Sequence, residues 1–350
     1  MALKILTVVG ARPQFIKAAA VSRAIRETND LYEVMIHTGQ HFDSNMSDVF
    51  FDELDIPLPR HHLDINGGGH GDMTGRMLIA IEPILLQEKP DWVVVYGDTN
   101  STLAGSLAAS KLRIPVAHVE AGLRSFNRRM PEELNRIVTD HLSTLHLCPT
   151  RTAAANLAAE GVARGVHHVG DVMYDATLFA ISKAEKSSVI LSSLGLEAGQ
   201  YAVATVHRAE NTDDPQHLRA VVEFLQERAR THQVVLPLHP RTRHAASRMG
   251  VGLDGLNVID PVGYLDMAKL LHHAAEVYTD SGGLQKEAYF HRVPCTTLRD
   301  ETEWTETVTQ GWNRLWKGPQ HVSRAEISEY GGGDAAFKVA KLLRASGAAS

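Results

Sequence analysis

Residues 92–96 read Trp-Val-Val-Val-Tyr and are followed at once by Gly97-Asp98-Thr99-Asn100-Ser101. A short, continuous run of apolar, β-branched residues is typical of a strand that helices cover on both faces. A helical pattern follows at about residues 101–112, and another short strand is expected at residues 116–119. Strand, helix and strand in this order predict a parallel sheet with right-handed crossovers.

The same alternation extends from this stretch toward both ends of the chain. Before it we expect strands at residues 4–9 and 32–37 with a helix to about residue 27, and after it helices at 131–142 and 150–160 flanking a strand at 145–148. The polar segment 182–200 then separates a second run, with strands expected at 201–206, 234–238, 257–259, 276–279 and 295–298 and helices at about 215–230, 265–274, 284–291 and 334–345.

The composition excludes several classes of protein. The 350 residues are 44% hydrophobic and 22% charged, which is typical of a globular chain of about two domains. The formal net charge of −6 disfavours a general nucleic-acid binder. We expect no membrane span and no signal peptide. The only cysteines, Cys148 and Cys295, are far apart and fit buried core residues in a reducing cytoplasm.

The glycine-rich segment 65–75 follows no strand cleanly, and we expect a mobile loop that could close over a ligand.

Other sequence features argue against a metal site and against several known nucleotide-binding motifs. His-His pairs at 61–62, 167–168 and 272–273 lack regular ligand spacing, so we expect surface or helix-end histidines and no metal site. The motifs G-x-G-x-x-G, G-x-x-x-x-G-K-[ST] and H-E-x-x-H are absent, which disfavours dinucleotide oxidoreductases, P-loop NTPases and zinc peptidases.

Charged residues of the first half stand where strands end. Arg12 closes the first strand, and Lys17 lies one turn into the next helix, so two cations are available for a phosphate or diphosphate. Asp98 and Glu120 each follow a strand, and Glu132 lies in the first turn of a helix. Each also has a purely structural interpretation, as a turn salt bridge for Arg12, an N-cap for Asp98 and a helix-dipole partner for Glu132.

The second half has a similar set. His207 follows the strand at 201–206 and is a candidate general acid or base, or a phosphate partner. Ser281, Gly282 and Gly283 open a helix directly after a strand, where free backbone N–H groups attract an anion, although an ordinary capped helix has the same pattern. Glu287, one turn further, could accept two hydrogen bonds from a ribose diol. Because ligands of open α/β sheets bind at the carboxyl edge of the strands, the two halves together predict a nucleotide site with acid/base groups in one cleft.

Eight motifs in a fixed order connect these residues with a known family. They are GARP, TGQH, GDT-x-S, HVEAGLR, PEE-x-NR, T-x-HR-x-EN, D-x-GG-x-x-KEA and RDETE, over about residues 5–305. The pattern resembles the non-hydrolysing UDP-N-acetylglucosamine 2-epimerases of bacterial surface-polysaccharide synthesis. The resemblance implies an α/β fold of two Rossmann-like, doubly wound domains facing a cleft (GT-B-like), with domains at 1–185 and 186–333 and a C-terminal helix, 334–350, that returns to the first domain.

The resemblance also implies a reaction and roles. Anti elimination of UDP gives a glycal-type intermediate, and UDP then adds back while a proton reaches the opposite face of C2. No metal or organic cofactor is implied, the partners are the UDP-sugar and UDP, and the enzyme would be a cytoplasmic homodimer. The implied catalytic residues are Asp98, Glu120, Glu132 and His207, and the implied substrate-binding and UDP-binding residues are Arg12, Lys17, Arg136, His239, Ser281, Gly282, Gly283, Glu287 and Arg299.

Departures from the common family pattern bear on the substrate. Gln14-Phe15 stands where many members have Glu, Phe42 stands where they have a basic residue, and 303–306 departs from their E-R-P-E. These variants resemble the subgroup acting on UDP-2,3-diacetamido-2,3-dideoxy-glucuronic acid, with UDP-N-acetylglucosamine as the alternative substrate. Changed surroundings of His41 and Asp43 put allosteric activation by UDP-N-acetylglucosamine in doubt. A GT-B glycosyltransferase, a hydrolysing epimerase and a non-catalytic UDP-sugar sensor remain as alternative functions.

Overall fold

The computed structural model describes residues 2–40, 51, 53–318 and 323–347 of the chain. The chain divides into unit 1, Met1–Ala176 with Ser328–Ser350, and unit 2, Thr177–Ile327. The sequence-based division was placed at 185/186 and 333/334. The chain passes from unit 1 to unit 2 within helix α7 (Val172–Ser187). The polar segment 182–200, where we expected the boundary, contains the end of α7 and helix α8 (Ile190–Ser193) and lies in unit 2.

Within the described residues, unit 1 is built on a seven-stranded parallel sheet. Its strand order is β3-β2-β1-β4-β5-β6-β7, so the winding reverses between β1 and β4. Every residue of β4 is buried, as the apolar run in the sequence predicts. The strands are β1 (Leu3–Val9), β2 (Leu31–His37), β3 (His61–His62), β4 (Trp92–Tyr96), β5 (Val116–Val119), β6 (Leu145–Cys148) and β7 (Val166–His168).

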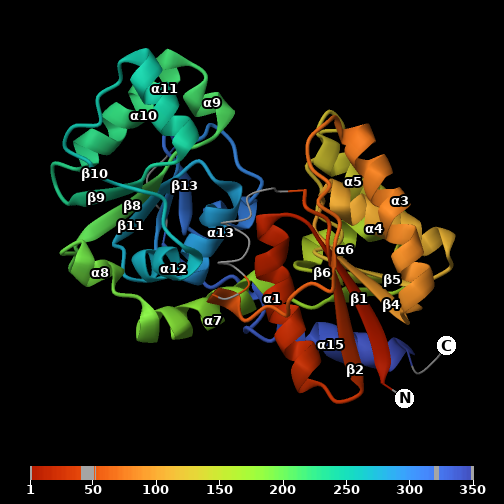
Figure 1. Cartoon of the computed structure of the whole chain (residues 1–350). Helices are drawn as coiled ribbons and strands as arrows, with labels where there is room; N and C mark the ends of the chain where they lie inside the picture. Colours follow the sequence, from red (N-terminus) through yellow and green to blue (C-terminus); the bar gives the residue numbers. More distant parts are fainter. Residues whose placement is uncertain (1, 41–50, 52, 319–322, 348–350) are drawn as a thin grey trace. The chain divides into compact units, whose positions relative to one another are not determined.

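Helices cover both faces of this sheet (Figure 1). Helices α3, α4 and α5 lie side by side on one face, and α1 and α15 pack together on the other. Besides the start of α7, the helices in the described part of unit 1 are α1 (Arg12–Glu27), α3 (His70–Glu88), α4 (Asn100–Lys111), α5 (Pro131–Leu142), α6 (Arg151–Ala159), the 3₁₀ turn η1 (Ser328–Tyr330) and α15 (Ala335–Gly347).

Helix α3 corrects the prediction of a loop over residues 65–75. The loop prediction is wrong from His70 onward, because α3 begins there and includes Gly71 and Gly75. Met77, Ile81 and Leu85 of this helix form one apolar stripe that is buried in the core against α4 and the sheet. Burial of that stripe offsets the low helix propensity of the glycines.

Unit 2 repeats the plan on a smaller sheet. Its six described strands are all parallel in the order β10-β9-β8-β11-β12-β13, and the winding reverses between β8 and β11. One face of this sheet packs against α8, α12 and α13, and the other against α10. The strands are β8 (Tyr201–Thr205), β9 (Gln233–Pro237), β10 (Asn257–Ile259), β11 (Glu276–Thr279), β12 (Cys295–Thr297) and β13 (Asn313–Leu315), and the helices besides α8 are α9 (Ala209–Thr212), α10 (Pro215–Arg228), α11 (Pro240–Met249), α12 (Tyr264–His272), α13 (Gly282–Phe290) and α14 (Thr305–Thr309).

The histidine pairs and the cysteines have simple structural places. The pairs at 61–62 and 167–168 lie in β3 and β7, the two edge strands of the unit 1 sheet, and not at helix ends. The pair at 272–273 does end a helix, α12. Cys148 and Cys295 are free and buried, as expected for core residues. In the described part of the chain, no helix is long and apolar enough to cross a membrane.

Candidate active site

The predicted site residues of unit 1 gather at the point where its winding reverses. Arg12 begins α1 just after β1, Asp98 lies just after β4, and Glu120 lies just after β5. The side chain of Gln14 joins the first two of these turns, since it accepts hydrogen bonds from Gly10 N (2.8 Å) and Ala11 N (3.1 Å) and donates to Tyr96 O (2.8 Å). This edge is where doubly wound sheets bind ligands.

Two ion pairs hold the carboxylates of this cluster. Lys17 Nζ lies 2.6 Å from Glu120 Oε1, and both side chains are largely buried. Arg136, on α5, pairs with Asp98 Oδ2 and, at 2.7 Å, with Glu133 Oε2. The structure therefore brings Lys17, Asp98, Glu120 and Arg136 together.

Asp98 differs electrostatically from an ordinary carboxyl group. Burial raises its pKa, and the negative charges of Glu120 and Glu132 raise it further, while Arg136 and Lys17 act in the opposite direction. Glu132, the third carboxylate, lies in the first turn of α5, the helix that also carries Arg136. A carboxyl group whose pKa is raised is suited to act as a general acid.

In unit 2, His207 lies just after β8 and is fixed by a buried carboxylate. Asp280, which is fully buried at the end of β11, accepts hydrogen bonds from His207 N, Arg208 N and His207 Nδ1, each at 2.9 Å, and from Asn211 Nδ2 at 3.1 Å. Burial alone would raise the pKa of Asp280, but these bonds, led by that of His207, hold it below the ordinary value. Because an ionised carboxylate only accepts, His207 donates from Nδ1, and its Nε2 is the ring atom left for a ligand.

The remaining UDP-binding candidates lie around the start of α13 and beside His207. Ser281 is the N-cap of α13, and a Cβ at Gly282 would overlap Glu303 Oε1, so a carboxylate oxygen already lies over the amino end of this helix. Arg299 NH1 pairs with Glu303 Oε2 at 2.9 Å. His239 is the exposed N-cap of α11, and its ring packs edge-on against His207 with 5.7 Å between centroids. Gly283 is exposed and Glu287 is half-buried on the first turns of α13.

A pocket of about 260 Å³ lies in unit 2. Of the predicted site residues it includes only Arg299, so it does not by itself locate the site. Its lining residues are Glu210, Asn211, His217, Leu298, Arg299, Asp300, Glu301 and Trp316.

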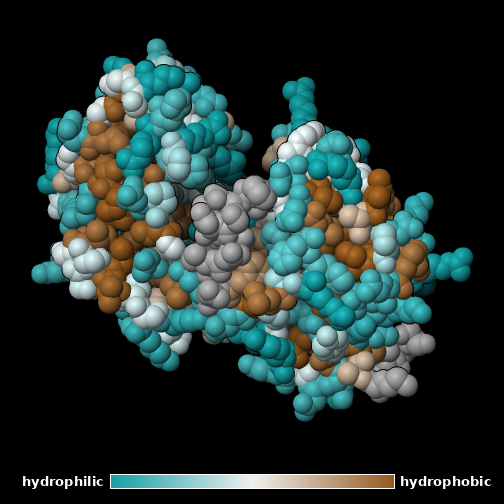
Figure 2. Space-filling view, viewed as in Figure 1, coloured by the Kyte–Doolittle hydropathy of each residue, from teal (hydrophilic) through white to brown (hydrophobic). Residues whose placement is uncertain are grey.

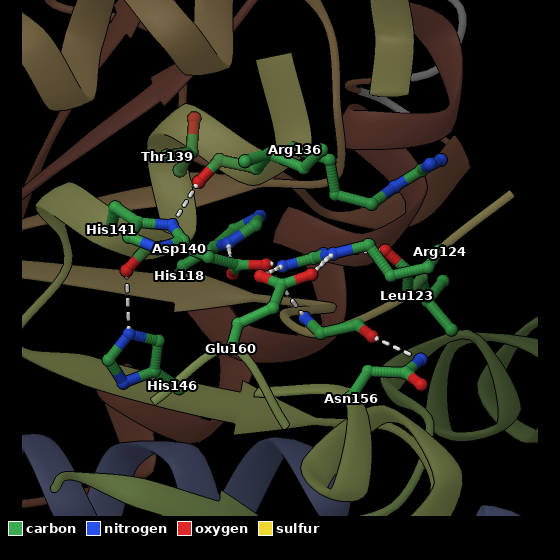
Figure 3. A network of polar contacts seen from close by, with 12 residues as sticks. His118, Leu123, Arg124, Arg136, Thr139, Asp140, His141, His146, Asn156 and Glu160 are labelled. Carbon is green, nitrogen blue, oxygen red and sulfur yellow. Dashed lines mark hydrogen bonds and ion pairs between the residues drawn. The ribbon is translucent and has the colours of Figure 1, made fainter. Parts of the chain in front are cut away.

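The structure also shows a polar network behind the unit 1 cluster that the sequence did not reveal as functional. His118, on β5, contacts Asp140 on α5, and Asp140 in turn contacts Arg124. Figure 3 shows the guanidinium of Arg124 between the carboxylates of Asp140 and Glu160. His118 and Arg124 belong to the HVEAGLR motif, and this membership was the only available signal, because Asp140 comes from a helix whose packing cannot be read from the sequence.

One group of described residues could hold a metal ion. Glu185, His272 and His273 each offer a ligand atom, and these atoms lie within 4.8 Å of one another. Lys269 Nζ already lies 3.0 Å from Glu185 Oε2, where it competes with any cation for that oxygen. The predicted differences around His41, Phe42 and Asp43 lie outside the described residues.

Comparisons with known proteins identify the family. The family model for UDP-N-acetylglucosamine 2-epimerase matches residues 23–344. A Pseudomonas aeruginosa UDP-2,3-diacetamido-2,3-dideoxy-D-glucuronate 2-epimerase is 53% identical, over 97% of this chain and 99% of that protein.

Solved structures agree with this result. A crystal structure of the Methanocaldococcus jannaschii UDP-GlcNAc 2-epimerase in complex with UDP-GlcNAc and UDP is 41% identical with a TM-score of 0.85, and covers 99% of this chain and 100% of that one. The Neisseria meningitidis UDP-GlcNAc 2-epimerase bound to UDP-GlcNAc is 28% identical with a TM-score of 0.88, and covers 98% of this chain and 100% of that one. The predicted fold class and family are confirmed, and the chain belongs to the UDP-N-acetylglucosamine 2-epimerase family of isomerases.

Proposed function

We propose that this enzyme inverts C2 of a UDP-sugar by eliminating UDP and adding it back, without releasing a free sugar. The C2 proton of a resting sugar is not acidic, but breaking the C1–O bond to UDP builds positive charge at C1 and acidifies C2–H. Removal of that proton gives a glycal-type intermediate and UDP. Return of UDP to C1, with a proton delivered to the opposite face of C2, yields the epimer.

The observation that carries this proposal is the cluster of carboxylates and cations at the switch point of unit 1. Inversion needs one group that removes a proton and another that supplies one. Asp98, whose pKa is raised chiefly by burial, is suited to supply the proton. Glu120, whose carboxylate lies 2.6 Å from Lys17 Nζ, is proposed to remove one. Glu132 is the third acid/base candidate.

Residues of unit 2 are proposed to hold the nucleotide. The amino end of α13, with Ser281, Gly282 and Gly283, offers backbone N–H groups to the diphosphate, and Glu287 offers a carboxylate to the ribose. His207, held by Asp280 through Nδ1, presents Nε2 and would stabilise the departing diphosphate. His239 and Arg299 complete this set, and Arg12 is a further proposed UDP-binding residue.

The favoured substrate is UDP-2,3-diacetamido-2,3-dideoxy-glucuronic acid, converted to the mannuronic acid epimer for O-antigen or a related glycan. Support comes from the relative of that activity, which is 53% identical, whereas the UDP-N-acetylglucosamine 2-epimerase of Methanocaldococcus jannaschii is 44% identical over 89% of this chain. Gln14 stands where many members of the family have Glu. In this structure the side-chain amide of Gln14 donates a hydrogen bond to Tyr96 O. UDP-N-acetylglucosamine is the alternative substrate.

A direct comparison of the two UDP-sugars tests the substrate proposal. Each is incubated with the enzyme, and the products are separated and identified. We expect epimer from the diacetamido-uronate at a much higher kcat/KM than from UDP-N-acetylglucosamine, and the reverse preference would overturn the substrate choice. Free sugar plus UDP would indicate a hydrolysing epimerase, transfer to an added acceptor a glycosyltransferase, and binding without turnover a sensor.

We also propose that the enzyme acts as a homodimer in the cytoplasm. Large apolar side chains are exposed on the two helices that flank α4 in unit 1, with Ile79 and Leu86 on α3 and Leu134 and Val138 on α5. Figure 2 shows apolar side chains among polar ones over the part of unit 1 where α3 and α4 lie. The unpaired state of Cys148 and Cys295 suits a reducing compartment.

A further inference from the structure

His118 lies directly behind the two turns that carry Asp98 and Glu120, and both of its ring nitrogens contact protein groups. Its side chain is fully buried in β5. Its Nδ1 lies 2.7 Å from Asp140 Oδ1, and its Nε2 lies 2.7 Å from the backbone oxygen of Gly97. We infer that His118 is a doubly protonated, positively charged histidine that, together with Asp140, positions the proposed acid/base carboxylates Asp98 and Glu120. This inference rests on the proposed function of those two residues.

The protonation of His118 follows from its two partners. A backbone carbonyl can only accept a hydrogen bond, so Nε2 must carry a proton. Asp140 Oδ2 accepts from Gly122 N at 3.1 Å and from Arg124 NH1 at 2.7 Å, contacts that stabilise an ionised carboxylate. Burial alone would raise the pKa of Asp140, but His118 and Arg124 hold it below the ordinary value. The ionised Asp140 can only accept, and Nδ1 must carry a proton as well.

A buried cation of this kind requires compensating charge, and the network supplies it. Asp140 lies between His118 and Arg124, and Arg124 binds Glu160 through two contacts of 2.7 Å (Figure 3). The four groups therefore carry two positive and two negative charges.

Two side chains of the neighbouring strand β6, His146 and Cys148, lie beside this network. His146 Nε2 lies 2.8 Å from Asp140 O, a backbone carbonyl. Burial, together with the charge of Asp140, raises the pKa of the Cys148 thiol to about 12 and keeps it neutral. Among these contacts, the positive charges of His118 and Arg124 are therefore balanced by the carboxylates of Asp140 and Glu160.

His118 and Asp140 each form a hydrogen bond with the backbone of one of the two turns that carry Asp98 and Glu120. His118 holds the carbonyl of Gly97, the residue before Asp98, and Asp140 holds the N–H of Gly122, two residues after Glu120. Both turns have unusual backbone geometry, with φ of +61° at Gly97, +72° at Glu120 and +80° at Gly122. One ion pair thus fixes the directions in which two carboxylates project, and small displacements of such groups cost large factors in rate.

Two substitutions at one position separate these contacts. The amide nitrogen of Gln reaches about as far as Nε2, and that of Asn about as far as Nδ1. His118→Gln therefore keeps a donor for Gly97 O, and His118→Asn keeps a donor for Asp140 but loses Gly97. We expect kcat to fall about 10- to 100-fold in His118→Asn, with KM and the affinity for UDP within about threefold, and partial recovery of kcat in His118→Gln.

His146→Gln is the matched control. It alters a histidine that is also buried and also contacts a backbone carbonyl, but that does not contact Gly97. We expect it to lower the melting temperature much as the His118 variants do while kcat stays within about threefold of wild type. Equal loss of kcat in His146→Gln and His118→Asn would overturn the positioning role, since the loss would then follow stability alone.

A measurement independent of activity tests the charge. In protein with ¹⁵N-labelled histidine, the signals of His118 are identified by their absence from His118→Gln, and the number of its ring N–H protons is counted at about pH 7. We expect two protons, and a neutral ring with one proton would overturn the inference.

The failures of the two proposals are distinguishable. If the wild-type enzyme turns over without exchange at C2, the proposed function fails, whatever the state of the His118 ring. If wild type exchanges at C2 and His118→Asn has wild-type kcat, only the positioning inference fails.

Discussion

At the scale of single residues, the neighbours of each carboxylate and of His207 set the role that we propose for it. Asp98 and Glu120 are both carboxylates in ion pairs, Asp98 with Arg136 and Glu120 with Lys17, and burial raises the pKa of Asp98. Two carboxyl groups in unlike environments can divide the acid and base roles of one reaction. In unit 2, Asp280 similarly orients His207 by fixing which ring nitrogen donates.

The first prediction concerns these carboxylates. We expect Asp98→Asn and Glu120→Gln each to lower kcat by about 10²- to 10⁴-fold, while UDP affinity stays within about tenfold, because loss of an acid or base acts mainly on the chemical step. Asp72→Asn, which changes an exposed carboxylate on α3, serves as the control. Steady-state kinetics and UDP titration check this, and normal rates in both site variants would mean that the carboxylates are structural.

The sequence predicted Asp98, Glu120 and His207 because each follows a strand. In this class of fold, side chains at the carboxyl ends of the strands lie at the ligand site. It did not predict their partners. Asp140 contacts His118 across 22 positions of the sequence, and Asp280 contacts His207 across 73. Such contacts depend on how a helix or a neighbouring strand packs, which short sequence patterns do not specify.

At the scale of elements, the strands were easier to predict than the helices. Strands 257–259 and 276–279 and helix 131–142 have the predicted bounds, because short β-branched runs and a helix-opening proline are local signals. Helix α3 was missed because its glycines suggest a loop, while the contacts that stabilise it come from α4. Helix α11 was missed because its sequence is strongly polar.

The second prediction belongs to the junction of α7 and α15. Asp175 on α7 accepts hydrogen bonds from Ala336 N at 2.8 Å and Ala335 N at 3.3 Å, and so caps α15. Burial raises its pKa from 3.8 to about 6 despite these bonds. Between those values the unfolded chain releases a proton that the folded chain keeps, so the free energy of unfolding falls as the pH rises from 3.8 to about 6.

Urea unfolding of Asp175→Asn checks this assignment. We expect the variant to lose that part of the pH dependence, so that its stability relative to wild type is lowest at low pH and rises toward about pH 6. Asp72→Asn should retain the wild-type slope. Parallel curves for Asp175→Asn and wild type would show that Asp175 does not titrate in this range.

At the scale of the whole molecule, two sheets of the same winding each place ligand-binding edges at a reversal of strand order, between β1 and β4 and between β8 and β11. The proposed division of labour follows the units, with proton transfer assigned to unit 1 and nucleotide binding to unit 2. The sequence allowed this organisation to be predicted because the alternation of strands and helices restarts after residue 200.

The third prediction concerns assembly. If α3 and α5 form a dimer interface, a charge placed among their exposed apolar side chains should weaken it, because burying an unpaired charge is costly. We expect wild type to sediment as a dimer and Ile79→Glu with Val138→Glu to sediment as a monomer. Phe337→Glu, which changes an exposed apolar residue on α15, is the control. A dimer that persists in the double variant would place the interface elsewhere.

The most direct test of the central claim is turnover in D₂O. If UDP leaves C1 and returns while a proton is exchanged at C2, the epimerised product carries one solvent-derived deuterium at C2, which mass spectrometry and NMR detect. The account predicts this label in every product molecule formed, with UDP-sugar and not free sugar as the product. An epimer that retains the original hydrogen at C2 would contradict the elimination route.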